Sequence, residues 1–170
     1  SDSINGQAGN DSITGNAGMD SLQGDAGTDV FVVAAAAHIV GANTETIDGG
    51  TGDDTISLTG TDTYTLTTGT NNITNVEVVS IDSDAAGYVV TLDDAMAATS
   101  DLGAANSGTV RVDAGQAMTN GVTINASDFT GNQELLVSDA DFGGNDTIVG
   151  GAGSDSINGQ AGNDSITGNA

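Results

Sequence analysis

The chain of 170 residues contains no cysteine, no proline and no tryptophan, and Arg111 is its only Lys or Arg residue. The absence of cysteine excludes a disulfide scaffold and thiolate metal sites. One basic side chain against 24 acidic ones, a net charge of −23, cannot displace counterions from nucleic acid and is repelled by an anionic membrane surface. No apolar run approaches the ~20 residues of a membrane-spanning helix. We therefore expect neither nucleic acid nor membrane insertion among its interactions.

Aromatic residues are scarce at 3%, and together with the high charge this composition is typical of disordered chains. Yet 36% of the residues are hydrophobic, and the acidic residues are almost all aspartate, with glutamate only at positions 45, 77 and 134. Aspartate is short, and it suits tight turns and sites for hard cations. The composition therefore indicates a fold that a bound cation completes.

A nine-residue unit repeats in two blocks, with glycine at its first and fourth positions, aspartate at its sixth and an apolar residue at its eighth. The first complete copy runs from Gly6 to Thr14. Further copies begin at positions 15, 24, 49, 150 and 159, and a degenerate copy begins at Asp141. The apolar positions are in phase, because Ile4, Ile13, Leu22 and Phe31 lie nine residues apart. Accidental phase in a Gly/Asp-rich linker does not produce this pattern.

A longer repeat encloses the first one. Residues 1–17 are identical to residues 154–170, and the offset of 153 residues equals 17 × 9. We expect the chain to be one unit of 153 residues plus the opening of the next, a window on a tandem array within a longer protein. The alternative is a terminal cap that was copied by design.

The nine-residue unit resembles the RTX calcium-binding nonapeptide repeat, G-G-x-G-x-D-x-U-x, where U is a large apolar residue. This resemblance implies a parallel β-roll in which each unit forms a six-residue turn and a short strand, and two units make a coil of 18 residues. The aspartates obey that spacing in the pairs Asp2/Asp20, Asp11/Asp29 and Asp146/Asp164. Stacked carboxylates ~4.8 Å apart repel by about 3 kcal/mol at an effective dielectric near 20. Calcium, which takes six to eight oxygen ligands, is the expected cofactor, with several ions per repeat.

The resemblance also implies the ligands, which are backbone carbonyls and the sixth-position aspartates of turns one coil apart. One expected site comprises Gln7, Gly9 and Asp11 with Gly24, Ala26 and Asp29. A second comprises Phe142, Gly144 and Asp146 with Gly159, Ala161 and Asp164. A third comprises Asp2 with Gly15, Ala17 and Asp20, and its missing half is supplied by Gly151, Gly153 and Asp155 of another copy. Asp54 has no aspartate 18 residues away in a matching turn, and we expect it to pair with the 15–20 turn if residues 32–48 bulge out.

The fold class expected is all-β, a parallel β-roll or β-solenoid with calcium-binding turns at both ends. The domains are a β-roll over 1–31, a β-rich middle over 32–140 with one RTX-like turn at 49–57, and a β-roll over 141–170. The middle is expected to be solenoid-like, or else a small β-sandwich. Strand-like runs are predicted at 55–58, 63–66, 73–81, 88–92, 109–112, 122–124 and 134–137. Two alanine-rich runs, 33–40 and 93–102, are predicted to form short helices or bulges.

The function expected is structural: a calcium-dependent repeat unit of an extracellular fibre or matrix protein of a bacterium, joined end to end with other copies of itself. A surface-layer subunit and the extender region of a giant RTX adhesin are the alternatives, and contact with surface glycan or lipopolysaccharide is left open. Ice binding and the C-terminal roll of a secreted enzyme are remote alternatives. Catalysis is not expected, because the chain has one histidine, no lysine, no HExxH signature and no G-x-S-x-G motif.

Overall fold

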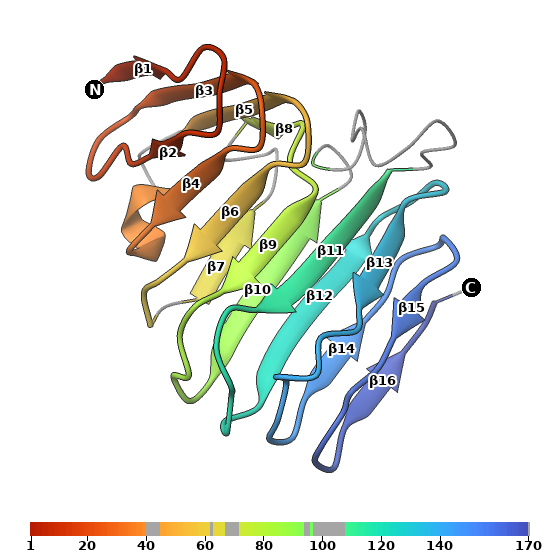
Figure 1. Cartoon of the computed structure of the whole chain (residues 1–170). Helices are drawn as coiled ribbons and strands as arrows, with labels where there is room; N and C mark the ends of the chain where they lie inside the picture. The colour runs from red at the N-terminus through yellow and green to blue at the C-terminus, as the bar shows by residue number, and fades with distance from the viewer. Residues whose placement is uncertain (40–44, 62, 67–71, 94–95, 97–107, 170) are drawn as a thin grey trace.

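The computed structural model describes residues 1–39, 45–61, 63–66, 72–93, 96 and 108–169. These residues form three sheets, drawn in Figure 1. Sheet A contains β1 (Ser3–Asn5), β3 (Ser21–Ala26), β5 (Thr46–Thr51) and β8 (Asn72–Thr74). Sheet B contains β2 (Ser12–Ile13), β4 (Val30–Val33), β6 (Thr55–Leu58), β9 (Val78–Ile81), β11 (Thr109–Ala114), β13 (Glu134–Val137) and β15 (Ser156–Ile157). Sheet C contains β7 (Thr63–Leu66), β10 (Tyr88–Asp93), β12 (Val122–Asp128), β14 (Thr147–Val149) and β16 (Ser165–Thr167).

Every strand pair is parallel, and strands follow one another across each sheet in sequence order. The first pairs join residues 18 apart, as Ser3↔Ser21 and Ser12↔Val30, so each coil of the chain lies directly on the preceding one. Figure 1 places the two termini at opposite ends of the resulting stack. The expected all-β parallel roll is confirmed, and the middle is a solenoid rather than a sandwich.

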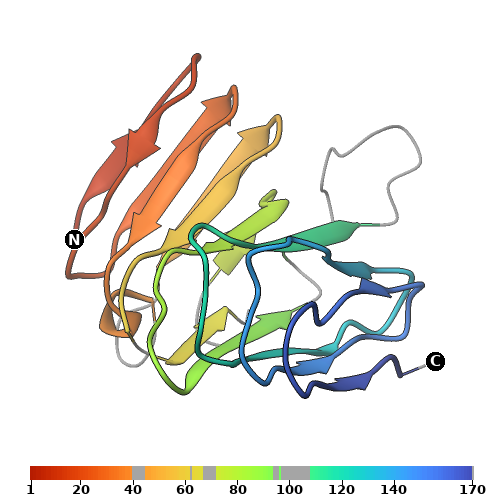
Figure 2. The same ribbon diagram turned by 60° about the horizontal axis from the view of Figure 1, so that its bottom comes forward.

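The coils differ in which sheets they contribute to. The first two coils place one strand in sheet A and one in sheet B. The next two, with β5–β6–β7 and β8–β9–β10, contribute to all three sheets, and the later coils contribute only to sheets B and C. Figure 2 shows this change along the stack, from the N-terminal half to the C-terminal half. Sheet B is therefore continuous, while its partner changes from A to C at the three-sided middle.

The interior is one apolar cluster that extends through the stack. Side chains alternate between buried and outward positions along the strands, as period-two strand geometry requires. The Tyr64 and Tyr88 rings, on β7 and β10 of the middle coils, are stacked with centroids 5.6 Å apart, and both are fully buried. Phe31, Phe129 and Phe142 are buried as well.

Three predicted runs, 55–58, 63–66 and 134–137, match β6, β7 and β13 at both ends. The run 73–81 was wrong as a single strand, because the chain turns at Asn75, where φ is +55°, and the two halves enter sheets A and B. The first alanine-rich run forms a short 3-10 helix, Ala36–His38, and most of the second lies outside the described residues. Within the described residues no helix is long and apolar enough to cross a membrane.

Candidate metal sites

The turns that begin the nonapeptide units have a common backbone conformation. At the second position φ is +72° at Gln7, +63° at Asn16, +72° at Asp25 and +60° at Gln160. At the fourth position φ is also positive, +132° at Gly9 and +144° at Gly27, values that side chains with a Cβ rarely adopt. The fourth-position glycine is needed for a second reason, since a Cβ on Gly27 would overlap the carbonyl oxygen of Gly9 in the turn below. Glycine therefore permits both the turn and the close stacking of turns.

A carboxylate ladder follows the edge where sheet A passes into sheet B. We call Asp11, Asp29, Asp54 and Glu77 the first ladder. The backbone N–H of each acid donates to the carboxylate of the acid one coil later, with N–O distances of 2.8 Å from Asp11 to Asp29, 2.8 Å from Asp29 to Asp54 and 2.9 Å from Asp54 to Glu77. These bonds hold successive carboxylates in line at the spacing of the strands.

A second ladder follows the opposite edge and comprises Asp2, Asp20 and Glu45. The N–H of Asp2 lies 2.6 Å from Asp20 Oδ1, and the N–H of Asp20 lies 3.4 Å from Glu45 Oε2. Both ladders of the N-terminal half thus have a glutamate at their inner end, in the three-sided middle.

The C-terminal half holds the third ladder, Asp146 and Asp164, where the N–H of Asp146 lies 3.0 Å from Asp164 Oδ1. Here a strand amide precedes the first acid, because the Val122 N–H donates to Asp146 Oδ1 at 2.9 Å. On the other edge the Leu135 N–H donates to Asp155 Oδ1 at 2.9 Å. The third ladder and the Leu135–Asp155 bond on the other edge therefore start at strands of the middle segment and reach the last coil.

The second oxygen of these aspartates indicates a bound cation. An Oδ2 atom that is buried and accepts no hydrogen bond occurs in Asp11, Asp20, Asp29, Asp54, Asp146 and Asp155. A buried carboxylate oxygen without a partner is costly, whereas a hard cation coordinates it. The six orphaned oxygens fit calcium at the turns.

Backbone carbonyls share the space around these oxygens. A Cβ on Gly6 would lie 2.7 Å from Asp11 Oδ2 and 3.1 Å from the carbonyl oxygen of Gly24, the first residue of the turn one coil later. On the second ladder, a Cβ on Gly15 would lie 2.9 Å from both Asp20 Oδ2 and Glu45 Oε1. The first-position glycines therefore leave room for carboxylate and carbonyl oxygens to converge, and oxygen is the ligand that calcium prefers.

Burial raises the pKa of several ladder acids. The pKa of Asp54 is raised to about 6, because burial and the nearby charges of Asp29, Asp53 and Asp48 outweigh the lowering effect of the bond from the Asp29 amide. Burial raises the pKa of Glu45 to about 7, against the lowering effect of its bond from the Asp20 amide. The pKa of Asp146 is raised for the same primary reason. Without a cation, these carboxyl groups retain protons at pH values where exposed acids have lost them.

The expected ligands differ in how the structure places them. Turns 6–11 and 24–29 stack directly, but the Gln7 carbonyl also accepts the Ala26 N–H at 2.8 Å, and the Ala26 carbonyl accepts the Gly9 N–H at 2.9 Å. In the 150–155 turn, the position of a Cβ on Gly151 is filled by Phe129, and that on Gly153 by the Gln133 backbone. The 150–155 turn therefore stacks on the connection after β12 rather than on another nonapeptide turn.

The remaining expected ligands lie in the same turns as the ladder aspartates. Gly15 and Ala17 precede Asp20 on the second ladder. Phe142 and Gly144 precede Asp146, and Gly159 and Ala161 precede Asp164, with Gly143 and Ala161 bridged across the two turns. Within the described residues, no group of three or more His, Asp or Glu side chains gathers as a metal centre. Each candidate site accordingly relies on main-chain oxygens besides its two acids.

The expected pairing of Asp54 with the 15–20 turn is wrong. Asp54 pairs with Asp29 of the 24–29 turn, because this coil is longer than 18 residues and the acids that meet across it are 25 residues apart. Glu45 and Glu77, which are 2% and 1% exposed, were not predicted as ladder members. Their signal is an acid two residues before an apolar strand position, as in Glu45-Thr46-Ile47, without the glycines of the repeat.

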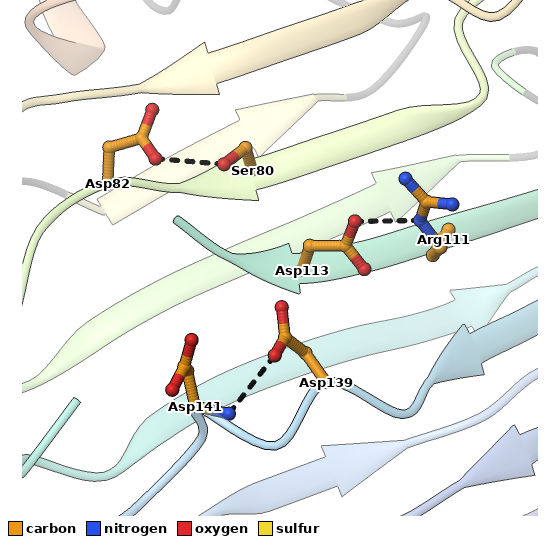
Figure 3. Close-up of polar contacts among 6 residues, drawn as sticks. All are labelled: Ser80, Asp82, Arg111, Asp113, Asp139 and Asp141. Atoms are coloured by element: carbon orange, nitrogen blue, oxygen red, sulfur yellow. Dashed lines mark hydrogen bonds and ion pairs between the residues drawn. The ribbon is translucent and has the colours of Figure 1, made fainter. Parts of the chain in front are cut away.

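Outside the ladders, Figure 3 shows acidic side chains on β11 and on the connections that follow β9 and β13. Arg111, the only Lys or Arg residue of the chain, pairs with Asp113 at 2.7 Å. Asp82 accepts a bond from Ser80 at 2.9 Å, and Asp139 accepts the Asp141 N–H at 3.1 Å. These acids have hydrogen-bonding partners and belong to no ladder.

The fold and these sites define a parallel β-roll that binds calcium through stacked turns. The family model of the RTX calcium-binding nonapeptide repeat (4 copies) matches residues 1–31, 39–73 and 142–170, more than half of the chain. The chain belongs to this family, and calcium is the ion that its repeats bind. No curated protein and no solved structure matches the chain significantly.

Proposed function

We propose that this chain is a calcium-dependent structural unit of an extracellular bacterial fibre or matrix, which joins other copies end to end by continuing the β-roll. The observation that carries the proposal is the identity of residues 1–17 and 154–170. The proposal includes no catalytic activity, in keeping with the single histidine and the absence of lysine.

Identical residues at the two ends have the same local structure, which supports the proposal. Gln7 and Gln160 have φ values of +72° and +60°, and their N–H groups donate to Asn5 and Asn158 at 2.8 Å and 3.0 Å. The coil at each end is the outermost of its sheets, so its strands have an open edge. An open edge pairs readily with another strand, and a second unit is the partner whose sequence matches.

The alternatives are a surface-layer subunit and the extender of a giant adhesin. Both use repetition and calcium, and they differ from a fibre in the shape of the assembly. Negative-stain electron microscopy of the chain in millimolar calcium should show single filaments for a fibre, whereas a surface layer gives sheets and an extender gives a rod with a distinct tip.

The test of end-to-end joining is sedimentation of the chain with calcium and with EGTA. We expect calcium to convert monomers into filaments and EGTA to reverse this. Asp164→Asn, in the last turn, should weaken association, while the exposed Asp128→Asn, which removes the same charge from a strand end, should not. A chain that is folded by calcium but remains monomeric would contradict the proposal.

A further inference from the structure

The same sequence lies in different sheets at the two ends of the molecule. Residues 3–5 form β1 in sheet A, and their equivalents 156–158 contain β15 in sheet B. Residues 12–13 form β2 in sheet B, and their equivalents 165–166 belong to β16 in sheet C. The position of a strand in the coil is thus preserved, while the sheet that it enters is not.

We propose that sheet B of one unit continues as sheet A of the next, and sheet C as sheet B, so that each unit ends one sheet and begins another. This inference rests on the proposed end-to-end joining and specifies its geometry. The partner is a second copy of this sequence, either later in the same polypeptide or as a separate chain.

The carboxylate ladders support this continuation, because they are complete only across the joint. Asp164 is equivalent to Asp11, so the third ladder continues as the first ladder of the next unit, from Asp146 through Asp164 to Glu77. Asp155 is equivalent to Asp2, so the other edge continues through Asp20 to Glu45. Each continuous ladder then starts at a strand amide of one unit and ends at a glutamate of the following one.

The apolar faces support it as well. Ile13 is 4% exposed because the coil with Phe31 covers it, whereas its equivalent Ile166 is 46% exposed on the last coil. A following coil would cover Ile166 in the same way. Ile157, equivalent to Ile4, is half-buried at the same end and would meet the neighbouring strand.

A joint that kept sheet B in register with sheet B is sterically excluded for separate copies. It would place Ser12 of the second copy beside Ser156, one 18-residue coil further on. If the numbering of the first copy is continued along the stack, residue 1 of the second copy would then stand at position 163. The first copy already occupies that position with the coil that contains its own β16. In the proposed joint, Ser3 lies beside Ser156 and Ser12 beside Ser165, and residue 1 falls beyond position 170.

Cysteine pairs test this arrangement cleanly, because the chain has no cysteine of its own. All four serines are exposed. Neighbouring parallel strands are ~4.8 Å apart, within disulfide range, whereas residues on opposite sheets are ~10 Å apart or more. Mixing Ser156→Cys with Ser3→Cys in calcium, and separately Ser165→Cys with Ser12→Cys, should give disulfide-linked dimers in a redox buffer. The matched control, Ser156→Cys with Ser12→Cys, should not.

Efficient cross-linking in the control pair, with little in the other two, would overturn the sheet succession while leaving end-to-end joining intact. Filaments without cross-links in any pair would show that copies meet through other surfaces, which also overturns it. Monomers in calcium, seen by sedimentation of the same mixtures, would overturn the proposed function itself. The three failures are therefore distinguishable.

Discussion

At the scale of single residues, the two oxygens of a ladder aspartate have different surroundings. In Asp29 and Asp54, Oδ1 accepts a backbone N–H from the coil before, so the protein itself satisfies it, while Oδ2 is buried without a protein partner. Hydrogen bonding therefore positions the side chain, and cation binding uses the remaining oxygen.

Asp29→Asn tests this division at one site. The amide can keep the bond from the Asp11 N–H, yet it removes the charged oxygen, so the calcium midpoint of folding should rise by roughly tenfold or more. Circular dichroism during a calcium titration measures the midpoint. Asp25→Asn is the matched control: it lies in the same turn with φ of +72°, which asparagine tolerates, and should shift the midpoint by only about twofold. Equal shifts would mean that overall acidity, and not the site, governs binding.

The raised pKa values of Glu45 and Asp54 predict a pH dependence. Their folded-state pKa values, about 7 and about 6, lie above the unfolded values of 4.5 and 3.8, so the calcium-free fold binds protons that the unfolded chain releases. The stability of the calcium-free fold is therefore greatest at low pH and falls between about pH 4 and pH 7.

Calcium has the opposite dependence, because it competes with those protons. Its affinity should rise from pH 5 to pH 7, by up to about tenfold per pH unit for each proton displaced, and level off above pH 7. Calcium titrations at pH 5, 6 and 7.5 measure this, with Glu134→Gln, outside the ladders, as a control. A midpoint that is independent of pH would contradict the assignment of these acids to the sites.

At the scale of elements, the turn and the strand of each nonapeptide depend on different contacts. The strand of a nonapeptide is stabilised by burial of its apolar eighth-position side chain. The turn is stabilised by stacking on the neighbouring turn at a distance that leaves no room for a Cβ. Turn stacking is thus as much a packing constraint as the apolar core.

Gly27→Ala and Gly9→Ala separate stacking from backbone strain. Both glycines have positive φ, +144° and +132°, so each alanine costs about 1 kcal/mol or more in backbone strain. Only at Gly27 would the Cβ also overlap the carbonyl below, whereas nothing lies within 4 Å of a Cβ on Gly9. In a chain kept monomeric by low concentration, Gly27→Ala should lower the Tm in saturating calcium clearly more than Gly9→Ala. Equal losses would show that turn stacking contributes little.

The sequence determines the regular parts of this fold more clearly than the irregular ones. The nine-residue phase of Ile4, Ile13 and Leu22 predicts strands and turns, since one spacing serves both. It fails where coils are enlarged, because the acid-to-acid separations become 25 residues at Asp29–Asp54 and 23 at Asp54–Glu77. An 18-residue rule therefore assigns Asp54 the wrong partner and does not find Glu77.

The sheet assignment was also beyond prediction. The identical residues 1–17 and 154–170 enter different sheets, so the repeat alone does not encode the sheet. The difference arises in the middle, where β7 and β10 begin sheet C while β5 and β8 complete sheet A. Of those strands only β5 reaches into a nonapeptide copy, the one that begins at Gly49, and only the three-dimensional stacking of whole coils reveals the change.

At the scale of the whole molecule, a net charge of −23 opposes a compact state unless cations neutralise it. The carboxylate ladders extend from the end coils into the middle, where the Asp54 N–H lies 2.9 Å from Glu77, and the middle also contains the large buried side chains Tyr64 and Tyr88. Because the ladders reach the middle, loss of calcium should destabilise the middle coils as well as the end coils.

Removal of calcium should therefore unfold the chain. Circular dichroism should show coil in EGTA and β-structure in millimolar calcium, while magnesium at the same concentration should not substitute, because it demands small octahedral sites and releases water reluctantly. A native β-signal in EGTA would contradict calcium-driven folding. Retention of part of the signal would show that residues 32–140 form an autonomous core, and hydrogen exchange would locate it.

The three-sided middle has a mechanical consequence for an array of such units. Sheets A and C coexist over two coils, so the new sheet starts before the old one stops. The two sheets therefore overlap along the rod axis instead of meeting end to end, and no single plane across the rod passes through the ends of all the sheets. Sheet B continues past the overlap. Tension along the rod would therefore be transferred from sheet A to sheet C by shear between their packed faces and that of sheet B.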